Sequence, residues 1–434
     1  MILEMAHSAH VPKPLRVLVS EGSSTSAREA ITILGLSGHL IEVCDPSPYC
    51  LARFSRFVGK FHRCPGLRDD PAGFLSFVEK LLAARHFDVL LPTHEQGFLF
   101  ARARQRLEGR VGLALPGFPS YRTVHGKARF SRLLDQLGLP QPPTAIVKSE
   151  RELRDAIRFP CLVKTSVGTA SRGIWFVHDD VDLEGALQDL NTQSLGANGA
   201  FADEVLVQDL IVGTTEKAQA VFCRGQLIGF HAYRQIAAGA GGGEAIKQGV
   251  RRPQVRAHLA TIGQKLAWHG ALSVDYVLPD DDAVPRLIDG NPRLVEPMSA
   301  YLAGVDLVGL LLQVSQGETP TAAAESREGV RTHLAMQALL GCASRGGTRR
   351  DVIHECWRLL TGSAPYADST EELTPVRLDW ISAVPVAMIV ISLLIAPKLA
   401  VTLARGGWGA HLLDVKSIRL IESEDFPQDM SAEQ

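Results

Sequence analysis

The sequence predicts an α/β domain followed by an α+β domain and a mostly helical C-terminal region. Residues 16–107 alternate short apolar runs with amphipathic helical segments, the pattern of a parallel sheet with helices on both faces. Residues 144–291 contain many closely spaced strands that favour antiparallel pairing. Residues after 325 show mainly helical patterns. We therefore place the three regions at residues 1–120, 121–325 and 326–434.

Composition supports a multidomain globular protein. The 434 residues are 46% hydrophobic and 21% charged, which suffices for large buried cores. The 45 Lys and Arg residues nearly balance the 47 Asp and Glu residues, so no global charge attracts nucleic acid, and we expect no nucleic-acid partner. None of the seven cysteines forms a C-x-x-C pair, and residues 1–15 lack a continuous apolar stretch. We expect a cytoplasmic protein.

The first region is expected to form a Rossmann-like layer. Ser24 and Ser26 can cap its first helix, and the turn at 20–26 lacks the G-x-G-x-x-G pattern of a dinucleotide site. His94 and Glu95 follow a strand but do not form an H-E-x-x-H motif. The expected strands are 16–20, 39–45, 60–64 and 87–92, and the helices are 27–36, 72–85 and 95–107.

The middle region begins after a boundary at 115–125, where two prolines and a glycine interrupt the pattern. A helix at 126–139 comes first and ends before Pro140. Two strands turn at Arg224–Gly225 and suggest an antiparallel pair. The expected strands are 144–147, 161–166, 173–178, 205–212, 216–223, 226–233, 272–278 and 285–291, with helices at 180–190 and 254–268.

A lysine followed by small residues suggests a phosphate site. Lys164 ends an apolar strand, and small side chains after it would let backbone N–H groups approach phosphate oxygens. The segment is not a Walker A loop, and an ordinary surface hairpin is the alternative. The small residues are Gly168, Thr169, Ala170, Ser171 and Gly173.

Two acidic residues on neighbouring strands suggest a metal site. Asp275 and Asp289 each interrupt an apolar run, where an unpaired charge would be costly, and Asn291 lies two residues further on the same face. Carboxylate and amide oxygens suit Mg²⁺. Arg293, on that face too, could hold a phosphate or a carboxylate. We interpret residues 280–282 as an exposed acidic turn.

The order of these pieces resembles the ATP-grasp superfamily, in particular its carbamoyl-phosphate synthase and biotin carboxylase-like branch. Lys127 begins a helix, Lys164 precedes the small-residue loop, a hinge strand covers 205–213, and a D…DGNPR pattern closes the set at Arg293. The resemblance covers about residues 16–320. It implies an ATP-grasp fold, with the first region as the pre-ATP-grasp domain.

The resemblance also implies roles for individual residues. Lys127 and Lys164 would contact the phosphates of ATP, and Glu216 would lie near the ribose or the nucleotide. Arg293 would face the transferred phosphate or the acyl substrate. Asp289 stands where glutamate is more common, so the number of bound metal ions, one or two, stays open. The hinge meeting adenine would be Gln208, Asp209, Leu210 and Ile211, and the Mg²⁺ (or Mn²⁺) ligands would be Asp275, Asp289 and Asn291.

A glycine-rich stretch resembles the mobile loop that closes over the active site in this superfamily. Five glycines fall between 239 and 249, with Arg234 before them and Lys247 near their end, and both basic residues become catalytic candidates. A disordered surface loop is the alternative. Glu296 resembles the glutamate that handles bicarbonate in biotin carboxylases, but the interval from Arg293 is one residue shorter. Glu296 therefore stays a candidate either for direct contact with the substrate or for support of the residues that make this contact.

The main hypothesis is an ATP-dependent ligase that joins a small-molecule carboxylate to an amine through an acyl phosphate. Three alternatives stay open: a bicarbonate-activating enzyme, a non-catalytic ATP-binding module, and a membrane-associated scaffold. The last comes from residues 380–397, an uncharged run near the threshold of about 20 apolar residues for a membrane span. A membrane helix, a surface helix that contacts membrane or protein through 380–405, and a buried helix are all considered. The oligomeric state stays open.

Overall fold

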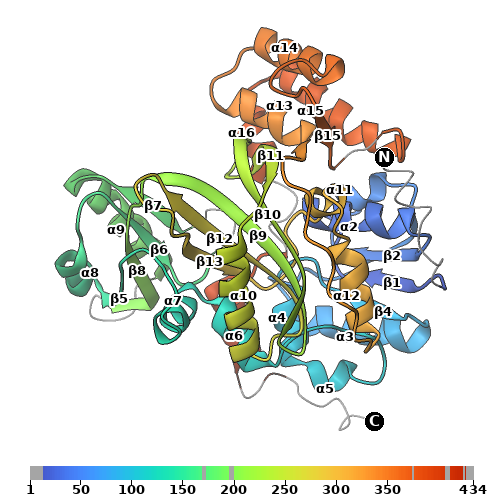
Figure 1. Ribbon diagram of the computed structural model, residues 1–434, viewed down its shortest axis with the longest axis horizontal. Coiled ribbons are helices and arrows are strands. Elements are labelled where there is room, and N and C mark those ends of the chain that lie inside the picture. The colour runs from blue at the N-terminus through green and yellow to red at the C-terminus, as the bar shows by residue number, and fades with distance from the viewer. Residues whose placement is uncertain are drawn as a thin grey trace.

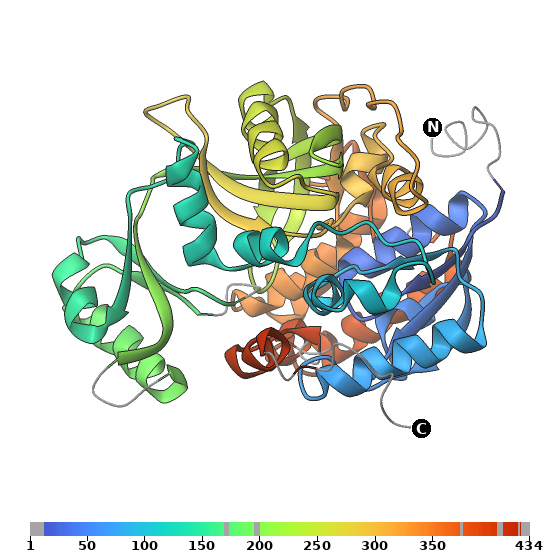
Figure 2. The ribbon, with the colours of Figure 1, turned by 90° about the horizontal axis from the view of Figure 1, so that it is seen from below.

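The computed structural model describes residues 13–168, 173–194, 200–373, 376–405, 411–423 and 426. Across these residues the strands form a parallel sheet, a small antiparallel sheet and a large sheet of seven strands. The small sheet and its helices form a lobe that projects from the body of the molecule (Figures 1 and 2). The C-terminal helices form a second projection at the top of Figure 1.

The N-terminal sheet confirms the predicted parallel α/β layer, with strand order β3-β2-β1-β4. Alternate residues of β1 pack into two separate cores: Val17 and Val19 on one face, Leu18 on the other. Ser24 caps α2, as expected, by accepting a hydrogen bond from the Ala27 backbone at 3.0 Å. The elements are β1 (Arg16–Val19), α2 (Thr25–Leu36), β2 (Leu40–Asp45), η1 (Leu51–Phe54), β3 (Val58–Arg63), α3 (Pro71–Ala84), β4 (Val89–Leu91), α4 (Gln96–Arg102) and α5 (Arg104–Leu107).

The projecting lobe has the strand order β5-β8-β6-β7, and every pairing is antiparallel. Two helices cover one face of this sheet around a core that includes Leu153, Val163 and Leu187. The elements, with the two helices that lead into them, are α6 (Phe118–His125), α7 (Lys127–Gln136), β5 (Thr144–Ser149), α8 (Glu150–Ala156), β6 (Cys161–Thr165), β7 (Ile174–Val177), α9 (Asp180–Ser194) and β8 (Ala200–Asp209).

The large sheet has the order β13-β12-β9-β10-β11-β14-β15. The predicted turn at Arg224–Gly225 is confirmed, and both residues have positive φ, as this tight hairpin requires. One expectation needs correction: the glycine-rich stretch is not wholly a loop, because residues 244–250 pair as a strand with β10. The elements are β9 (Gly213–Cys223), β10 (Gln226–Ala238), β11 (Glu244–Val250), α10 (Pro253–Lys265), β12 (Gly270–Pro279), β13 (Arg286–Asn291), β14 (Arg331–His333) and β15 (Ser369–Glu371).

The chain after residue 291 is mainly helical, although β14 and β15 extend the large sheet beyond residue 325. A buried ion pair joins this region to the N-terminal domain: Arg28 lies 2.8 Å from Asp379, and neither side chain is exposed. The elements are α11 (Met298–Leu302), α12 (Leu307–Ser315), α13 (Ala335–Ser344), α14 (Arg349–Thr361), η3 (Trp380–Ser382), α15 (Ala383–Ile395), α16 (Leu399–Arg405) and α17 (Val415–Glu422).

The uncharged run at 380–397 forms η3 and the 13-residue helix α15. Ile389 and Leu393 pack into the core of the helical region, whereas Met388, Ile391 and Ile395 are exposed. Helix α15 is therefore half-buried rather than enclosed. In the part of the chain that the structure describes, no helix has the length and apolar character needed to cross a bilayer.

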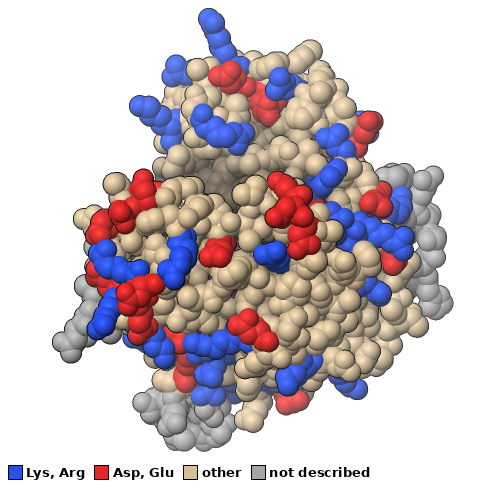
Figure 3. Space-filling view, turned by 60° about the vertical axis from the view of Figure 1, so that its left-hand side comes forward, with Lys and Arg blue, Asp and Glu red and all other residues tan. Residues whose placement is uncertain are grey.

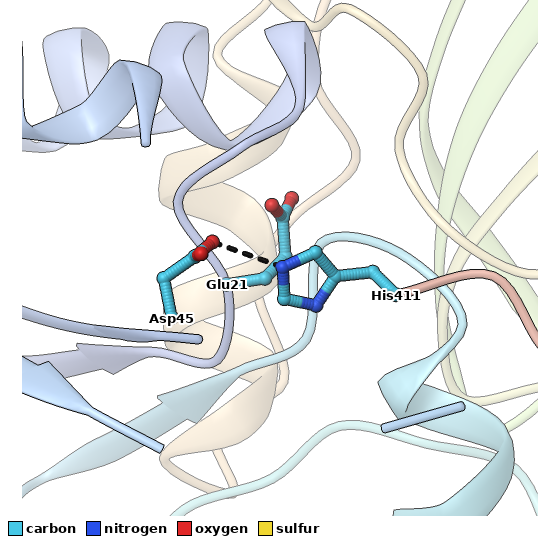
Figure 4. A group of neighbouring side chains, drawn as sticks. All are labelled: Glu21, Asp45 and His411. Carbon is cyan, nitrogen blue, oxygen red and sulfur yellow. Dashed lines mark hydrogen bonds and ion pairs between the residues drawn. The ribbon is translucent and has the colours of Figure 1, made fainter. Parts of the chain in front are cut away.

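The segment that begins at His411 returns to the N-terminal domain at the carboxyl end of its sheet. Figure 4 shows His411 beside Asp45 and Glu21, with Nε2 of the histidine 2.9 Å from Oδ2 of Asp45. Its other ring nitrogen lies 3.0 Å from the Gln96 amide. Asp45 also accepts hydrogen bonds from the backbone of Gly22 and from other donors. The group satisfies its own hydrogen bonds, so we interpret it as an anchor for the C-terminal segment.

Replacing this histidine should loosen the C-terminal segment. We expect His411→Ala to lower the free energy of unfolding by about 1–3 kcal/mol, because Asp45 and Gln96 lose a buried partner. Burial alone would lower the pKa of His411, but the carboxylates of Asp45 and Glu21 raise this pKa above its ordinary value. The ion-pair stabilisation is therefore present below the unfolded pKa and is lost as pH rises through the folded one.

Urea denaturation at pH 6 and pH 8.5 measures this effect, and the difference between wild type and variant should be larger at pH 6. His86→Ala is the matched control, since the side chain of His86 is 76% exposed beside Asp88. An equal loss of stability in the two variants would contradict the anchor interpretation.

Candidate functional site

A cavity of about 580 Å³ lies where the large sheet, the projecting lobe and the N-terminal domain meet. The space-filling view shows that this side of the molecule is hollowed below the C-terminal helical projection (Figure 3). The sequence-predicted residues that line the cavity are Lys127, Lys164, Gly168, Gln208, Asp209, Leu210, Ile211, Asp275, Asp289, Asn291 and Arg293. Residues from separate parts of the chain therefore converge on one space.

Lys127 links helix α7 to the loop that follows β6. Its backbone N–H donates to the carbonyl of Ser166 at 2.9 Å, and its ammonium donates to the carbonyl of Gly168 at 2.5 Å. The ammonium also lies 3.3 Å from Oδ2 of Asp289. The predicted phosphate loop therefore lies beside one predicted metal ligand. Thr169, Ala170 and Ser171 lie outside the described residues, and Gly173 accepts a hydrogen bond from Thr165 at 2.9 Å.

Lys164 is the penultimate residue of strand β6 and is 4% exposed. Its ammonium donates to Oε1 of Gln208 at 2.6 Å, which joins the predicted phosphate lysine to the predicted hinge. Burial lowers the pKa of Lys164 to about 8, while the carboxylate of Asp289 acts in the opposite direction. An anion in the cavity would restore the charged form of the lysine.

The affinity for ATP should therefore fall with rising pH. Bound phosphate favours protonated Lys164, and the free lysine loses its proton above pH 8, so the dissociation constant should rise by up to about tenfold per pH unit above that value. Titration with ATP between pH 7 and pH 9.5 measures this slope. Lys164→Arg, which keeps its charge throughout, is the control and should remove most of the slope. A wild-type affinity that does not change with pH would contradict the placement of phosphate beside Lys164.

Apolar side chains from both sheets face the hinge end of the cavity. Leu162, Ile174 and Phe176 come from the lobe, and Val277 and Ile288 come from the large sheet. The hinge follows directly, since β8 ends at Asp209 and residues 210–212 carry no strand pairing. A flat ring between two apolar surfaces, with the backbone of Leu210 and Ile211 at its edge, fits this end.

The two candidate metal carboxylates are direct partners. Asp275 on β12 pairs with Asp289 on β13, and Asn291 pairs with Ser273, so all three candidate ligands lie on one face of the sheet. Burial raises the pKa of Asp275 to about 6; Lys217 opposes this rise and Asp289 adds to it. Facing carboxylates with an amide oxygen beside them form an oxygen donor set that a divalent cation would stabilise. The residues fit Mg²⁺.

Arg293 contributes a further positive charge. Its side chain lines the cavity and the residue is 9% exposed. Among the residues that the structure describes, none accepts a hydrogen bond or forms an ion pair with its guanidinium group. A buried cation in this position is suited to binding a carboxylate or phosphate.

Four of the predicted residues that the structure describes do not line the cavity, which corrects the sequence-based site: Gly173, Glu216, Arg234 and Lys247. Thr215 and Lys217 line the cavity, so Glu216 between them points to the opposite face, where it binds Arg252 at 2.6 Å. The hydroxyl of Tyr276 donates to the same carboxylate at 2.9 Å. Arg234 is exposed and bonds Gln248 at 2.9 Å. Because side chains alternate between the two faces along a strand, Glu216 and Arg234 project away from the cavity.

Lys247 lies on the cavity side of the sheet but behind Glu296. Its ammonium forms ion pairs with Glu296 and, at 2.7 Å, with Glu372, and Glu29 belongs to the same carboxylate group. Burial alone would lower the pKa of Lys247, but these carboxylates raise this pKa above its ordinary value. Glu296 itself lines the cavity and accepts a hydrogen bond from Thr25 at 3.1 Å. Lys247 therefore holds Glu296 in place.

Sequence reasoning missed several residues that line the cavity. Lys217 and Glu244 form an ion pair there; Lys217 stands outside the recognised motifs, and Glu244 lies in the glycine-rich stretch, where only the basic residues were considered. The strand register opposite Asp275 was the signal that could have found Lys217. The other missed lining residues include Ser24, Thr25, Ser26, Gln235 and Gln337, and His94 now also lies at the cavity.

Solved structures share the fold over most of the chain. The biotin carboxylase domain of 2-oxoglutarate carboxylase from Hydrogenobacter thermophilus has a TM-score of 0.58 at 15% identity, covering 74% of each chain. An N5-carboxyaminoimidazole ribonucleotide synthetase has a TM-score of 0.58 at 14% identity, covering 77% of this chain and 85% of the other. An L-amino acid ligase from Bacillus licheniformis has a TM-score of 0.53 at 15% identity, covering 70% of this chain and 75% of the other. The chain has the ATP-grasp fold, as its sequence predicts.

In sequence, the chain is similar to carbamoyl phosphate synthase large chains. It is 25% identical over 224 residues to the one from Methanothermobacter thermautotrophicus, which is 48% of this chain and 21% of the relative. It is 28% identical over 209 residues to the one from Thermomicrobium roseum, and the match covers 44% of this chain and 18% of that relative. The match thus spans about a fifth of the length of these relatives. No protein-family model matches the chain.

Proposed function

We propose that the chain is an ATP-dependent ligase that activates a small-molecule carboxylate as an acyl phosphate. One observation carries the proposal: two lysines, an arginine and a paired set of acidic ligands, distant in sequence, line one cavity. Phosphoryl transfer depends mostly on positioning and charge neutralisation, which this set supplies. The fold it shares with the biotin carboxylase domain and the L-amino acid ligase supports the same reading.

The proposed reaction has two steps. A carboxylate oxygen held near Arg293 attacks the γ-phosphorus of ATP, and ADP leaves. An amine nitrogen then attacks the acyl carbon and loses a proton, and phosphate leaves. Lys127 and Lys164 would neutralise the phosphate oxygens, and Asp275, Asp289 and Asn291 would hold Mg²⁺, which would supply further positive charge to those oxygens. The hinge at 208–211 would position the base between the two apolar surfaces.

Bicarbonate is the second candidate substrate. The similarity to carbamoyl phosphate synthase large chains favours it, as does Glu296, which lines the cavity three residues after Arg293. Bicarbonate is a small carboxylate analogue, so the same cations could bind it. Lys247 and Thr25 hold the carboxylate of Glu296 at the cavity wall, and its backbone has a positive φ of 55°.

The test is a screen for ADP release. The purified full chain is incubated with ATP and Mg²⁺ and with pools of carboxylates and amines, and one arm contains bicarbonate with ammonia. We expect ADP release to depend on one carboxylate and to rise further with its amine. Release that depends on bicarbonate alone would favour the second candidate. ATP binding without turnover in any pool would overturn the ligase proposal in favour of a binding module.

A further inference from the structure

Lys217 introduces a positive charge beside the candidate metal carboxylates. On β9 it is the direct cross-strand partner of Asp275 on β12, which in turn pairs with Asp289 on β13. Side chains at directly opposed positions project from the same face, with Cβ atoms about 4.5–5.5 Å apart. Lysine, aspartate and aspartate therefore stand in a row across three strands, all lining the cavity.

A third carboxylate lies beside the end of this row, on strand β11. Glu244, the first residue of β11, is 3% exposed and forms an ion pair with the ammonium of Lys217, whose side chain is 19% exposed. The ammonium of Lys127 lies 3.3 Å from Asp289 on the other side. Three carboxylates thus share two ammonium groups, which leaves one net negative charge among them.

This charge pattern disfavours a pair of divalent ions. Two such ions close together need several uncompensated carboxylates, whereas here Glu244 is already paired and Asp275 faces an ammonium group. An ammonium group held beside Asp275 also repels a cation that approaches from its side. Asp289, with its short side chain and Lys127 next to it, has little freedom to bridge two ions.

We propose that Lys217 takes the place of a second metal cation, so that the site binds one divalent ion per nucleotide. The ammonium group of Lys217 then supplies the positive charge that a second ion would bring to the phosphates. This inference rests on the proposed function of the cavity, because it requires a nucleotide with its phosphates at Asp275 and Asp289.

Counting bound Mn²⁺ tests the inference without relying on activity. The full chain is saturated with a non-hydrolysable ATP analogue, Mn²⁺ is titrated in, and electron paramagnetic resonance gives the ions bound per bound nucleotide. We expect one ion in wild type and two in Lys217→Met, which keeps the length of the side chain but removes its charge. Lys217→Arg keeps the charge and should bind one. Lys80→Met, which removes an exposed lysine on α3, should also bind one.

Each outcome has a definite consequence. Two ions per nucleotide in wild type would overturn the inference alone, and so would a single ion in a folded, nucleotide-binding Lys217→Met chain. If that variant does not fold, Lys217→Gln provides a second neutral side chain with the same expectation. A wild-type chain that binds no nucleotide would instead overturn the proposed function, and the inference with it.

Discussion

Replacing Asp289 by alanine should reduce substrate-dependent ADP release by at least about 10²–10³-fold, because the cavity loses a metal ligand and the carboxylate beside Lys127. Lys164→Ala should cause a comparable loss, since it removes the ammonium beside the hinge residue Gln208 that we propose binds the phosphates of ATP. Both side chains stand at the cavity wall rather than in a hydrophobic core, so the variants should fold.

The measurement is single-turnover and steady-state ADP release with the substrate pair found by the screen. Asp281→Ala is the matched control, because it removes an exposed acidic side chain from the turn between β12 and β13. Circular dichroism and thermal denaturation establish that each variant is folded. Activity of either cavity variant within a few-fold of wild type would refute the assignment of the site.

Replacing Lys247 by methionine should give the largest loss of stability. The substitution keeps the volume of the side chain but leaves Glu29, Glu296 and Glu372 buried together without a counter-charge. Removing one partner of a buried ion pair costs about 3–5 kcal/mol. Urea denaturation of the full chain measures the change, with Lys265→Met on the exposed side of α10 as the control.

The loss should depend on pH in a definite direction. Burial raises the pKa of Glu372 to about 7, although the charge of Lys247 opposes this rise. Burial and the nearby carboxylate of Glu372 raise the pKa of Glu29 well above its ordinary value. Near pH 5 Glu372 holds a proton, so the uncompensated charge in the variant is smaller than near pH 8, where Glu372 has lost it. The difference between wild type and Lys247→Met should therefore grow from pH 5 to pH 8. A constant difference would contradict the charge-based account.

The sequence predicted most of the secondary structure because local signals were strong. The apolar run before Lys164, the proline stop after the helix at 126–139 and the Arg224–Gly225 turn all act within a few residues. The pairing of Asp275 with Asp289 was also predictable, since a short turn joins two strands of alternating pattern. Strand β11 was missed because glycines directly before it resembled a continuous loop.

The directions of several side chains could not be predicted. Glu216 and Lys217 are neighbours in sequence, and only the strand register shows that the lysine lines the cavity while the glutamate binds Arg252. Arg234 and Gln235 divide in the same way. A shift of one residue exchanges the two faces of a strand, so the number of residues between motifs does not decide which side chains share a site.

By itself the sequence determined most of the strands and helices, the ATP-grasp resemblance and most of the lysines and acidic residues that meet in the cavity, because these features follow from local patterns and motif order. Only the tertiary structure decided that Lys247 supports Glu296 rather than lining the cavity, that Lys217 stands beside Asp275, and that His411 anchors the C-terminal segment at Asp45. These contacts join residues tens to hundreds of positions apart, and their geometry depends on how the sheets and domains pack, which local patterns do not encode.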